Sequence, residues 1–289
     1  MKRIEESELI INADGTIFHL HLLPAQLADK VILVGDPGRV SLVASHFDEV
    51  EFQTANREFH TTTGTYQGKR ITVVSTGIGC DNIDIVLNEL DALANIDFIT
   101  RTPREALRQL TIVRIGTCGG LQPYTPTGTF IASEKSIGFD GLLNFYAGRN
   151  EVCDLALEQA FVTHTHWNPL LCAPYVIDAD EELLTRIAAN DMVRGITISC
   201  GGFYGPQGRE LRIPLAYPQL NKQIEAFTYQ DKQITNFEME SSAVAGLSKL
   251  LGHKALTCCM VVANRRAQNA DTNYQAQINK LITTVLNRI

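Results

Sequence analysis

The stretch VILVGDPGR, residues 31–39, decides the fold class. Four apolar residues, three of them β-branched, run into a Gly-Asp-Pro-Gly-Arg turn, and a helical pattern follows. A buried strand that leads through a short turn into a helix is the repeating unit of α/β proteins. The glycines also let backbone N–H groups approach an anion closely, and Arg39 adds a fork of donors. Taken alone, the same string is equally consistent with a tight β-turn.

Further short apolar runs predict buried strands at residues 71–77, 111–116, 129–133, 195–200 and 255–265. Helical patterns lie between several of these runs, at residues 81–96, 239–252 and 274–289. Asp81 is the predicted N-cap of the first helix, and Gly252 predicts the end of the second. This alternation predicts an α/β domain with a largely parallel or mixed sheet, and residues 1–289 contain no linker that would divide it.

Three segments are harder to assign. Residues 97–110 predict an inserted helix or arm, residues 138–170 a loop-rich region, and residues 217–233 a further surface helix. The chain contains no internal repeat and no low-complexity segment.

Composition narrows the class of protein. The 289 residues carry a formal net charge of -7, which argues against bulk nucleic-acid binding but allows a small anionic ligand beside a few arginines. The seven cysteines are scattered without a CxxC motif, so they predict reduced thiols rather than a disulfide framework or a zinc site. The N-terminal MKRIEESELI lacks the apolar core of a signal peptide, and no uncharged run reaches about 18 residues. We therefore expect a cytoplasmic protein without a membrane span.

The segment RIGTCGG, residues 114–120, begins with Arg114, a charged residue inside an otherwise apolar predicted strand. A strand is expected to end here in Arg114, Thr117 and glycines, and open α/β sheets bind ligands at the carboxyl ends of their strands. A buried guanidinium needs a partner. That partner is either an oxyanion ligand or an internal carboxylate.

The segment NFEMES, residues 236–241, lies at a predicted strand-to-helix transition. If the segment is extended, the carboxylates of Glu238 and Glu240 share one face. A buried carboxylate that accepts two hydroxyl hydrogens is suited to a vicinal diol. The alternative is the common placement of acidic residues at a helix N-terminus.

The segment FYGPQGR, residues 203–209, has the glycine and proline content of a turn. It also presents Gln207 and Arg209 two residues apart, after an aromatic pair. The segment is therefore either an ordinary surface turn or a recognition loop for a flat, polar ligand.

Two further motifs match known patterns incompletely. STGIGCDN, residues 75–82, has Asn82 where a dinucleotide fingerprint needs glycine, which excludes NAD. GTCGG could make Cys118 a nucleophile on an elbow, but this needs a strand–turn–helix context and a general-base histidine. The histidines that follow it, His164, His166 and His253, lie in no catalytic turn pattern.

Taken together, the motifs VGDPGR, NREF, STGIG, RIGT, FYGPQGR, NFEMES and VANR, in this order over residues 17–266, resemble the nucleoside phosphorylase family and within it most closely the uridine phosphorylases. The resemblance implies a single-domain, three-layer α/β sandwich around a mixed, partly closed β-sheet. It implies reversible phosphorolysis of uridine to uracil and α-D-ribose 1-phosphate in pyrimidine salvage. Phosphate is then a co-substrate, and no cofactor is expected.

The resemblance also implies roles for individual residues. The implied phosphate contacts are Gly35, Arg39, Arg57, Arg114 and Thr117. The implied ribose contacts are His19, Glu238, Met239 and Glu240. The implied base contacts are Phe203, Gln207 and Arg209, and the implied catalytic residues are Arg114, Gln207 and Arg209. In the family, the counterparts of His19 and Arg57 come from a neighbouring subunit, so self-association into at least a dimer is expected.

The choice between purine and pyrimidine depends on the late strand motif. Purine relatives carry an aspartate there, whereas this chain has Asn264 and Arg265. An amide at Gln207 and a guanidinium at Arg209 match the acceptor–donor–acceptor edge of uracil. Some relatives bind a monovalent cation between subunits; Glu58 matches that site but Asn82 replaces a serine, so no metal is expected.

Four alternatives stay open. They are a phosphorylase of broader or purine specificity, a hydrolytic nucleosidase on a related scaffold, a nucleoside-binding homologue without activity, and, most distant, a hydrolase with Cys118 as its nucleophile.

Overall fold

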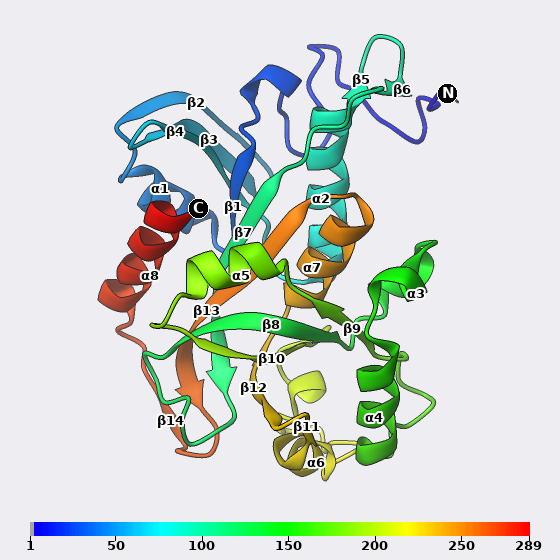
Figure 1. Cartoon of the computed structure of the whole chain (residues 1–289), viewed down its shortest axis with the longest axis vertical. Helices are drawn as coiled ribbons and strands as arrows, with labels where there is room; N and C mark the ends of the chain where they lie inside the picture. Colours follow the sequence, from blue (N-terminus) through cyan, green and yellow to red (C-terminus); the bar gives the residue numbers. More distant parts are fainter. Residues whose placement is uncertain (1–2) are drawn as a thin grey trace.

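Strand β1 (Lys30–Val34) is an inner strand of a large mixed sheet with helices on both faces (Figure 1). The computed structural model describes residues 3–289. The other strands of this sheet are β2 (Glu49–Asn56), β3 (Phe59–Tyr66), β4 (Lys69–Ser75), β7 (Thr111–Gly120), β8 (Phe130–Gly138), β9 (Tyr175–Asp178), β10 (Val193–Ser199), β11 (Thr228–Tyr229), β12 (Lys232–Glu238), β13 (Lys254–Asn264) and β14 (Asn269–Ala270). The helices are α1 (Pro37–Ala44), α2 (Cys80–Asn95), α3 (Arg149–Val152), α4 (Leu155–Thr165), α5 (Glu181–Ala188), α6 (Leu220–Ala226), α7 (Ser241–Leu250) and α8 (Gln275–Arg288).

The sheet closes on itself over part of its width. Strands β2, β3, β4 and β1 lead in this order to β7, and β13, β8, β10 and β12 follow. Strand β12 then pairs back with β7, antiparallel, through residues 236–237 and 119–120. Parallel pairs such as β1–β7 and β7–β13 coexist with antiparallel pairs such as β8–β13. The predicted mixed, partly closed sheet is confirmed.

The residues of β1 alternate between two apolar layers. Val31 and Leu33 belong to the cluster that contains the buried residues of α2 and α7, and Ile32 and Val34 to the cluster with α1, α5 and α8. Because both faces of the strand are covered, its sequence is an unbroken apolar run. Figure 1 shows α2 beside α7, and α8 and α5 in front of the sheet. The predicted three-layer sandwich is confirmed.

The helix ends agree with the sequence except at α2. Its N-cap is Gly79, with φ 102°, and Asp81 lies in the first turn. The prediction of Asp81 as N-cap was wrong, because the chain enters the helix with a backbone conformation that only glycine adopts easily. Gly252, at φ 80°, follows α7 as predicted. Tyr274 is the N-cap of α8, as the predicted range implied.

The segments that were hard to assign differ in outcome. The arm at 97–110 is no helix; β5 (Ile96–Asp97) and β6 (Thr102–Pro103) form a short hairpin within it. The segment 138–170 was predicted to be loop-rich but contains α3 and α4, and α4 is capped by Asp154 and anchored by Leu157 and Phe161. The predicted surface helix within 217–233 is α6.

Strand β7 is longer than its apolar run. It was expected to end near Gly116, but it continues to Gly120 because β13 pairs with it along its whole length. The polar, glycine-rich half of the motif is therefore extended backbone inside the sheet.

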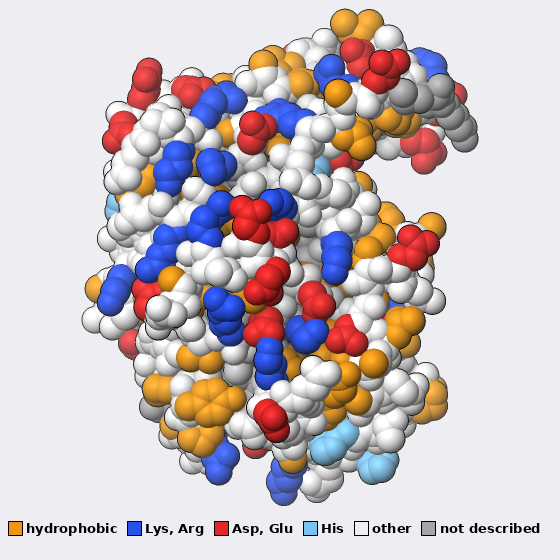
Figure 2. Space-filling view, viewed as in Figure 1, with side chains coloured by type: hydrophobic (Ala, Val, Ile, Leu, Met, Phe, Trp, Pro, Cys, Tyr) orange, Lys and Arg blue, Asp and Glu red, His pale blue; other side chains and the backbone are white. Residues whose placement is uncertain are grey.

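The molecular surface carries charges of both signs. On the face shown in Figure 2, acidic and basic side chains are interspersed over the centre. No helix within residues 3–289 is long and apolar enough to cross a membrane.

Candidate active site

A cavity of about 730 Å³ opens where β1 and β12 end and along the second half of β7. In α/β sheets, ligands bind at this edge. Most of the predicted site residues line this cavity: Gly35, Arg39, Arg114, Thr117, Phe203, Gln207, Arg209, Glu238, Met239 and Glu240. The fold therefore brings together four motifs that are far apart in the sequence.

One end of the cavity is built for an anion. Because β1 and β7 are parallel neighbours, the turn after β1 lies beside Arg114. Asp36 caps α1 by accepting the Gly38 N–H at 2.8 Å, and Arg39 Nη1 donates to the Ile115 carbonyl at 3.5 Å. Burial lowers the pKa of Arg39 below its ordinary value, and the charge of Arg114 lowers it further. A bound oxyanion would relieve this repulsion.

The middle of the cavity holds a buried charge triad. Arg114 Nη1 contacts Glu238 Oε2 at 3.3 Å, and Arg114 Nη2 donates to Glu240 Oε2. All three side chains are at most 5% exposed. The expected partner of Arg114 was either an oxyanion or an internal carboxylate. The structure shows two internal carboxylates as partners, and Arg114 also lines the cavity.

The surroundings of this triad raise the pKa values of Arg114 and Glu240. Burial alone would lower the pKa of Arg114, but the carboxylates of Glu240 and Glu238 outweigh it, and its pKa lies above the ordinary value. Burial raises the pKa of Glu240, against the opposing effect of Arg114. Arg114 is therefore a fixed cation, and Glu240 is the group of the pair that protonates more readily than an ordinary glutamate.

The loop of residues 203–209 forms the other end of the cavity. Gln207 is buried, and its Oε1 accepts from Arg209 Nη1 at 2.5 Å. The same Nη1 donates to the Phe203 carbonyl, and the guanidinium lies 3.8 Å from the centre of the Phe203 ring. The loop therefore holds this amide–guanidinium pair as one unit beside the cavity.

A fourth guanidinium, that of Arg265, lies near Arg209. Arg265, just after β13, is 5.1 Å from the ring centre of Phe237. Burial, together with the neighbouring charge of Arg209, lowers its pKa to about 10. Its Nη2 is buried without a hydrogen-bond partner within residues 3–289. No contact was predicted for Arg265 from the sequence. Its charge directly follows an apolar strand, as the charge of Arg114 interrupts one, so the sequence did mark it as unusual.

The apolar wall of the cavity was also missed. Phe237, Val262 and Ala263 line it, and they belong to ordinary apolar strand patterns that carry no signal of a site.

Cys118 lines the cavity but lacks the elbow that a nucleophile would need. It lies inside the extended strand β7, and the strand–turn–helix context is absent. Burial raises the pKa of its thiol well above the ordinary value. A protonated, buried thiol is a poor nucleophile, so the Cys118 hypothesis was wrong.

His19 and Arg57 do not line the cavity of their own chain. His19 Nδ1 pairs with Glu89 Oε1 at 2.6 Å, and its carbonyl accepts from Asn56 Nδ2 at 2.8 Å. Arg57 is exposed at the tip of the β2–β3 hairpin, with φ 55° and its guanidinium 5.7 Å from the Phe18 ring centre. The two predicted residues thus share one region outside the cavity.

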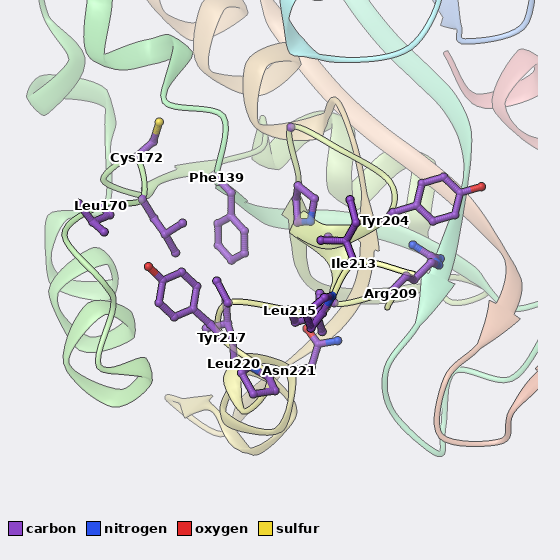
Figure 3. A pocket seen from close by; sticks show the side chains of 18 of the residues that line it. Phe139, Leu170, Cys172, Tyr204, Arg209, Ile213, Leu215, Tyr217, Leu220 and Asn221 are labelled. Carbon is purple, nitrogen blue, oxygen red and sulfur yellow. The ribbon is translucent and has the colours of Figure 1, made fainter. Parts of the chain in front are cut away.

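A larger cavity of about 940 Å³ also borders the loop of residues 203–209, which we call the recognition loop. Figure 3 shows its mainly apolar lining, which includes Phe139, Leu170, Ile213 and Leu215. Arg209 borders both cavities. Glu238, Glu240, Arg39 and Arg114 do not line the larger cavity. It is therefore not the candidate active site. Among residues 3–289, no group of three or more His, Cys, Asp or Glu side chains is placed to hold a metal ion.

Comparison with known proteins agrees with this geometry. Residues 29–287 match the model of the phosphorylase superfamily. The chain is 31% identical to the uridine phosphorylase of Thermococcus kodakarensis over 87% of its length and 79% of the relative, and 31% identical to that of Haemophilus influenzae over 87% and 88%. It superposes on a Trypanosoma brucei nucleoside phosphorylase described as having uridine phosphorylase activity, with a TM-score of 0.87 and 29% identity over 97% of this chain and 100% of the other. The chain therefore belongs to the phosphorylase superfamily.

Proposed function

We propose that this protein is a uridine phosphorylase, a pentosyltransferase that converts uridine and phosphate reversibly into uracil and α-D-ribose 1-phosphate. One observation carries the proposal. A single cavity presents a pair of arginines, two glutamates and an amide–guanidinium pair. Phosphate, a ribose diol and a flat base with polar edges need these three kinds of group together. Uridine phosphorylase is also the name of the relatives from Thermococcus and Haemophilus.

At the phosphate end, Arg39 and Arg114 supply the fixed positive charge, and the Gly35 backbone and Thr117 complete the site. Phosphate is a weak nucleophile, so the main task of this end is to hold it beneath C1′ of the ribose. The glycosidic bond breaks through an oxocarbenium-like state, which the adjacent phosphate anion stabilises.

At the base end, Gln207 and Arg209 meet the leaving uracil. Negative charge develops on the base oxygens as the bond to C1′ breaks, and donors aimed at those oxygens act most strongly in the transition state. Cytosine has the opposite donor pattern at two of its edge positions, so it would leave buried donors unpaired. We therefore expect cytidine to be rejected.

The proposal includes a second subunit. His19 and Arg57 lie together outside the cavity of their own chain. We propose that His19 contacts the ribose and Arg57 the phosphate of that neighbouring site. We further propose that the chain acts as one domain, without a cofactor, in pyrimidine salvage in the cytoplasm.

A substrate panel tests this function. Uridine, thymidine, cytidine and inosine are incubated with the enzyme, each with and without phosphate, and loss of nucleoside is followed by absorbance. Uridine is expected to react only with phosphate. Base release without phosphate would instead identify a hydrolytic nucleosidase, and a preference for inosine would identify a purine phosphorylase. Tight uridine binding without turnover would identify an inactive homologue.

A further inference from the structure

Asn264, the last residue of β13, stands in the late strand motif where purine relatives carry an aspartate. We propose that Asn264 is a positioning residue of the base end of the cavity, and that its amide ties the end of β13 to the turn after β7 instead of contacting a base. An aspartate at this position would then not create a purine site. This inference rests on the proposed function, because it concerns the choice between bases.

The side chain of Asn264 is kept away from the ligand. It is 2% exposed and does not line the cavity, whereas the preceding residues Val262 and Ala263 do. A base bound in the cavity therefore meets the strand before Asn264 and not the amide itself.

Each polar atom of the amide is paired with the protein backbone. Its Nδ2 donates to the Gln122 carbonyl at 3.1 Å and to the Thr125 carbonyl at 2.7 Å, and its Oδ1 accepts the Ala267 N–H at 2.9 Å. These partners fix the orientation of the amide, because a flipped amide would set its oxygen against two carbonyl oxygens. Both hydrogens of the amide are thus used inside the protein.

These hydrogen bonds lie where the sheet closes on itself. Gly120, the last residue of β7, pairs with Asn264 of β13 and with Asn236 of β12. A Cβ at Gly120 would lie 2.4 Å from the Thr125 carbonyl oxygen and 3.0 Å from Asn264 Nδ2, so the amide packs directly on the backbone of β7. Asn264 therefore holds β13, the end of β7 and the following turn together.

The segment that Asn264 anchors borders the base end. A Cβ at Gly119 would lie 3.8 Å from the Ala263 carbonyl oxygen and 3.9 Å from Arg209 Nη2, so these two groups flank the same point of β7. Without the Asn264 anchor, Ala263 should shift relative to Arg209, and the binding of the base should weaken.

An aspartate does not reproduce these contacts. One carboxylate oxygen would still accept the Ala267 N–H, but the other would face the carbonyl oxygens of Gln122 and Thr125 without a hydrogen between them. Buried acceptors that lose their donor destabilise the structure around them. The choice of base then depends on Gln207 and Arg209 of the recognition loop, and an exchange of Asn264 alone should not convert the enzyme to purine nucleosides.

The main test compares Asn264→Thr with Asn264→Val. The two new side chains have nearly the same shape, but only threonine has a hydroxyl that donates to one of the two carbonyls. Asn264→Val should raise KM for uridine about tenfold above that of Asn264→Thr, because it leaves both carbonyls unpaired. KM for phosphate should stay unchanged in both variants, since Arg39 and Arg114 remain in place. Steady-state kinetics with both substrates varied gives these values.

Asn264→Asp tests the choice of base. It should lower kcat/KM for uridine by about tenfold and release no hypoxanthine from inosine and phosphate. If Asn264→Asp does not fold, the threonine–valine pair decides alone. If Asn264→Val does not fold, Asn264→Thr is compared with the wild type. It keeps one of the two hydrogen bonds and should raise KM for uridine by about threefold.

Asn95→Val is the matched control. Asn95 is also a buried amide, whose Nδ2 donates to the Arg108 carbonyl at 3.2 Å and whose Oδ1 accepts the Arg108 N–H at 2.7 Å. It does not line the cavity. Asn95→Val should therefore lower Tm without changing KM for uridine, which separates positioning from a general loss of stability.

The inference is overturned if Asn264→Thr and Asn264→Val have the same KM for uridine, if Asn264→Thr equals the wild type where the valine variant does not fold, or if Asn95→Val raises KM as much. It is also overturned if Asn264→Asp cleaves inosine with phosphate. A wild-type protein that does not cleave uridine with phosphate would overturn the proposed function instead, so the two failures are distinct.

Discussion

Arg209 is held in place before any ligand arrives. Its guanidinium packs on Phe203 and bridges to Gln207 and to the backbone of the same loop. A donor that is already oriented needs little rearrangement when charge develops on a leaving base. The free energy gained from such a donor is therefore expressed mainly in the transition state.

Replacing Arg209 with alanine tests this role. We expect Arg209→Ala to lower kcat/KM for uridine by about 100-fold, because a preorganised donor to the departing base is lost. KM for phosphate should stay unchanged, since Arg39 and Arg114 remain in place. Steady-state kinetics with both substrates varied gives the two values. Arg212→Ala is the matched control, because Arg212 lies on the same segment but borders only the larger cavity. An equal effect of the two substitutions would contradict the assignment.

The raised pKa of Glu240 predicts an acid limb in substrate binding. Burial favours the protonated form of this carboxyl, and only the ionised form accepts hydrogens from both hydroxyl groups of the diol. As the pH falls through the raised value, Glu240 takes up a proton and KM for uridine should rise; above it, KM should be constant. KM measured between about pH 4 and pH 8 reveals the limb. With 2′,3′-dideoxyuridine, which lacks the diol, the limb should disappear, and its persistence would refute the role of Glu240.

Single residues were the most predictable part of the site. Arg114 stood out because a charge interrupted an apolar strand, and Gln207 and Arg209 because they followed an aromatic pair in a turn. Their partners could not be predicted, since the sequence does not say that Arg114 faces both Glu238 and Glu240. These ion pairs form only because β12 pairs back with β7, where the sheet closes on itself.

The recognition loop depends on one residue with a positive φ. Gly208 adopts φ 67°, and a Cβ at this position would overlap the side-chain amide of Asn221 on α6. That amide donates to the Gln207 carbonyl at 3.1 Å, so α6 and the loop are joined at a residue that we propose binds the base.

A methyl group at Gly208 should therefore disturb base recognition. We expect Gly208→Ala to cost about 1 to 2 kcal/mol in backbone strain and to raise KM for uridine. Gly205→Ala, in the same loop, is the control, because a Cβ there meets nothing within 4 Å. Thermal unfolding and uridine kinetics of both variants provide the comparison. If Gly205→Ala and Gly208→Ala behaved alike, the positive φ would not matter for function.

Elements were predicted where apolar runs were continuous. The unbroken apolar run of β1 and the helical period of α2 predicted their positions, because both elements are buried against other layers. Helix α4 was missed, since only Leu157 and Phe161 anchor it and its other residues are largely polar or exposed. The length of β7 was underestimated because pairing with β13, and not its own residues, extends it to Gly120.

At the scale of the whole molecule, the cavity of one chain lacks two of its predicted residues. His19 and Arg57 lie together outside it. The proposed second subunit follows from this separation, and a C2 dimer would place the same two residues at both sites.

Mixing two inactive variants tests the shared site. His19→Ala and Glu240→Gln each damage every site of their own homodimer. In a mixed dimer, one site receives His19 from one chain and Glu240 from the other, so about a quarter of all sites should regain wild-type activity after co-refolding. Activity of the mixture is compared with the two variants alone. Absence of recovery, despite mixed dimers seen by mass spectrometry, would contradict a site completed by the neighbour.

The central claim is that the enzyme transfers the ribosyl group of uridine to phosphate within this cavity. The most direct measurement is ³¹P NMR of the enzyme with uridine and inorganic phosphate, together with chromatographic detection of uracil. We predict that α-D-ribose 1-phosphate and uracil appear in equal amounts and that neither forms without phosphate. Formation of uracil with free ribose, and no phosphate ester, would contradict the account.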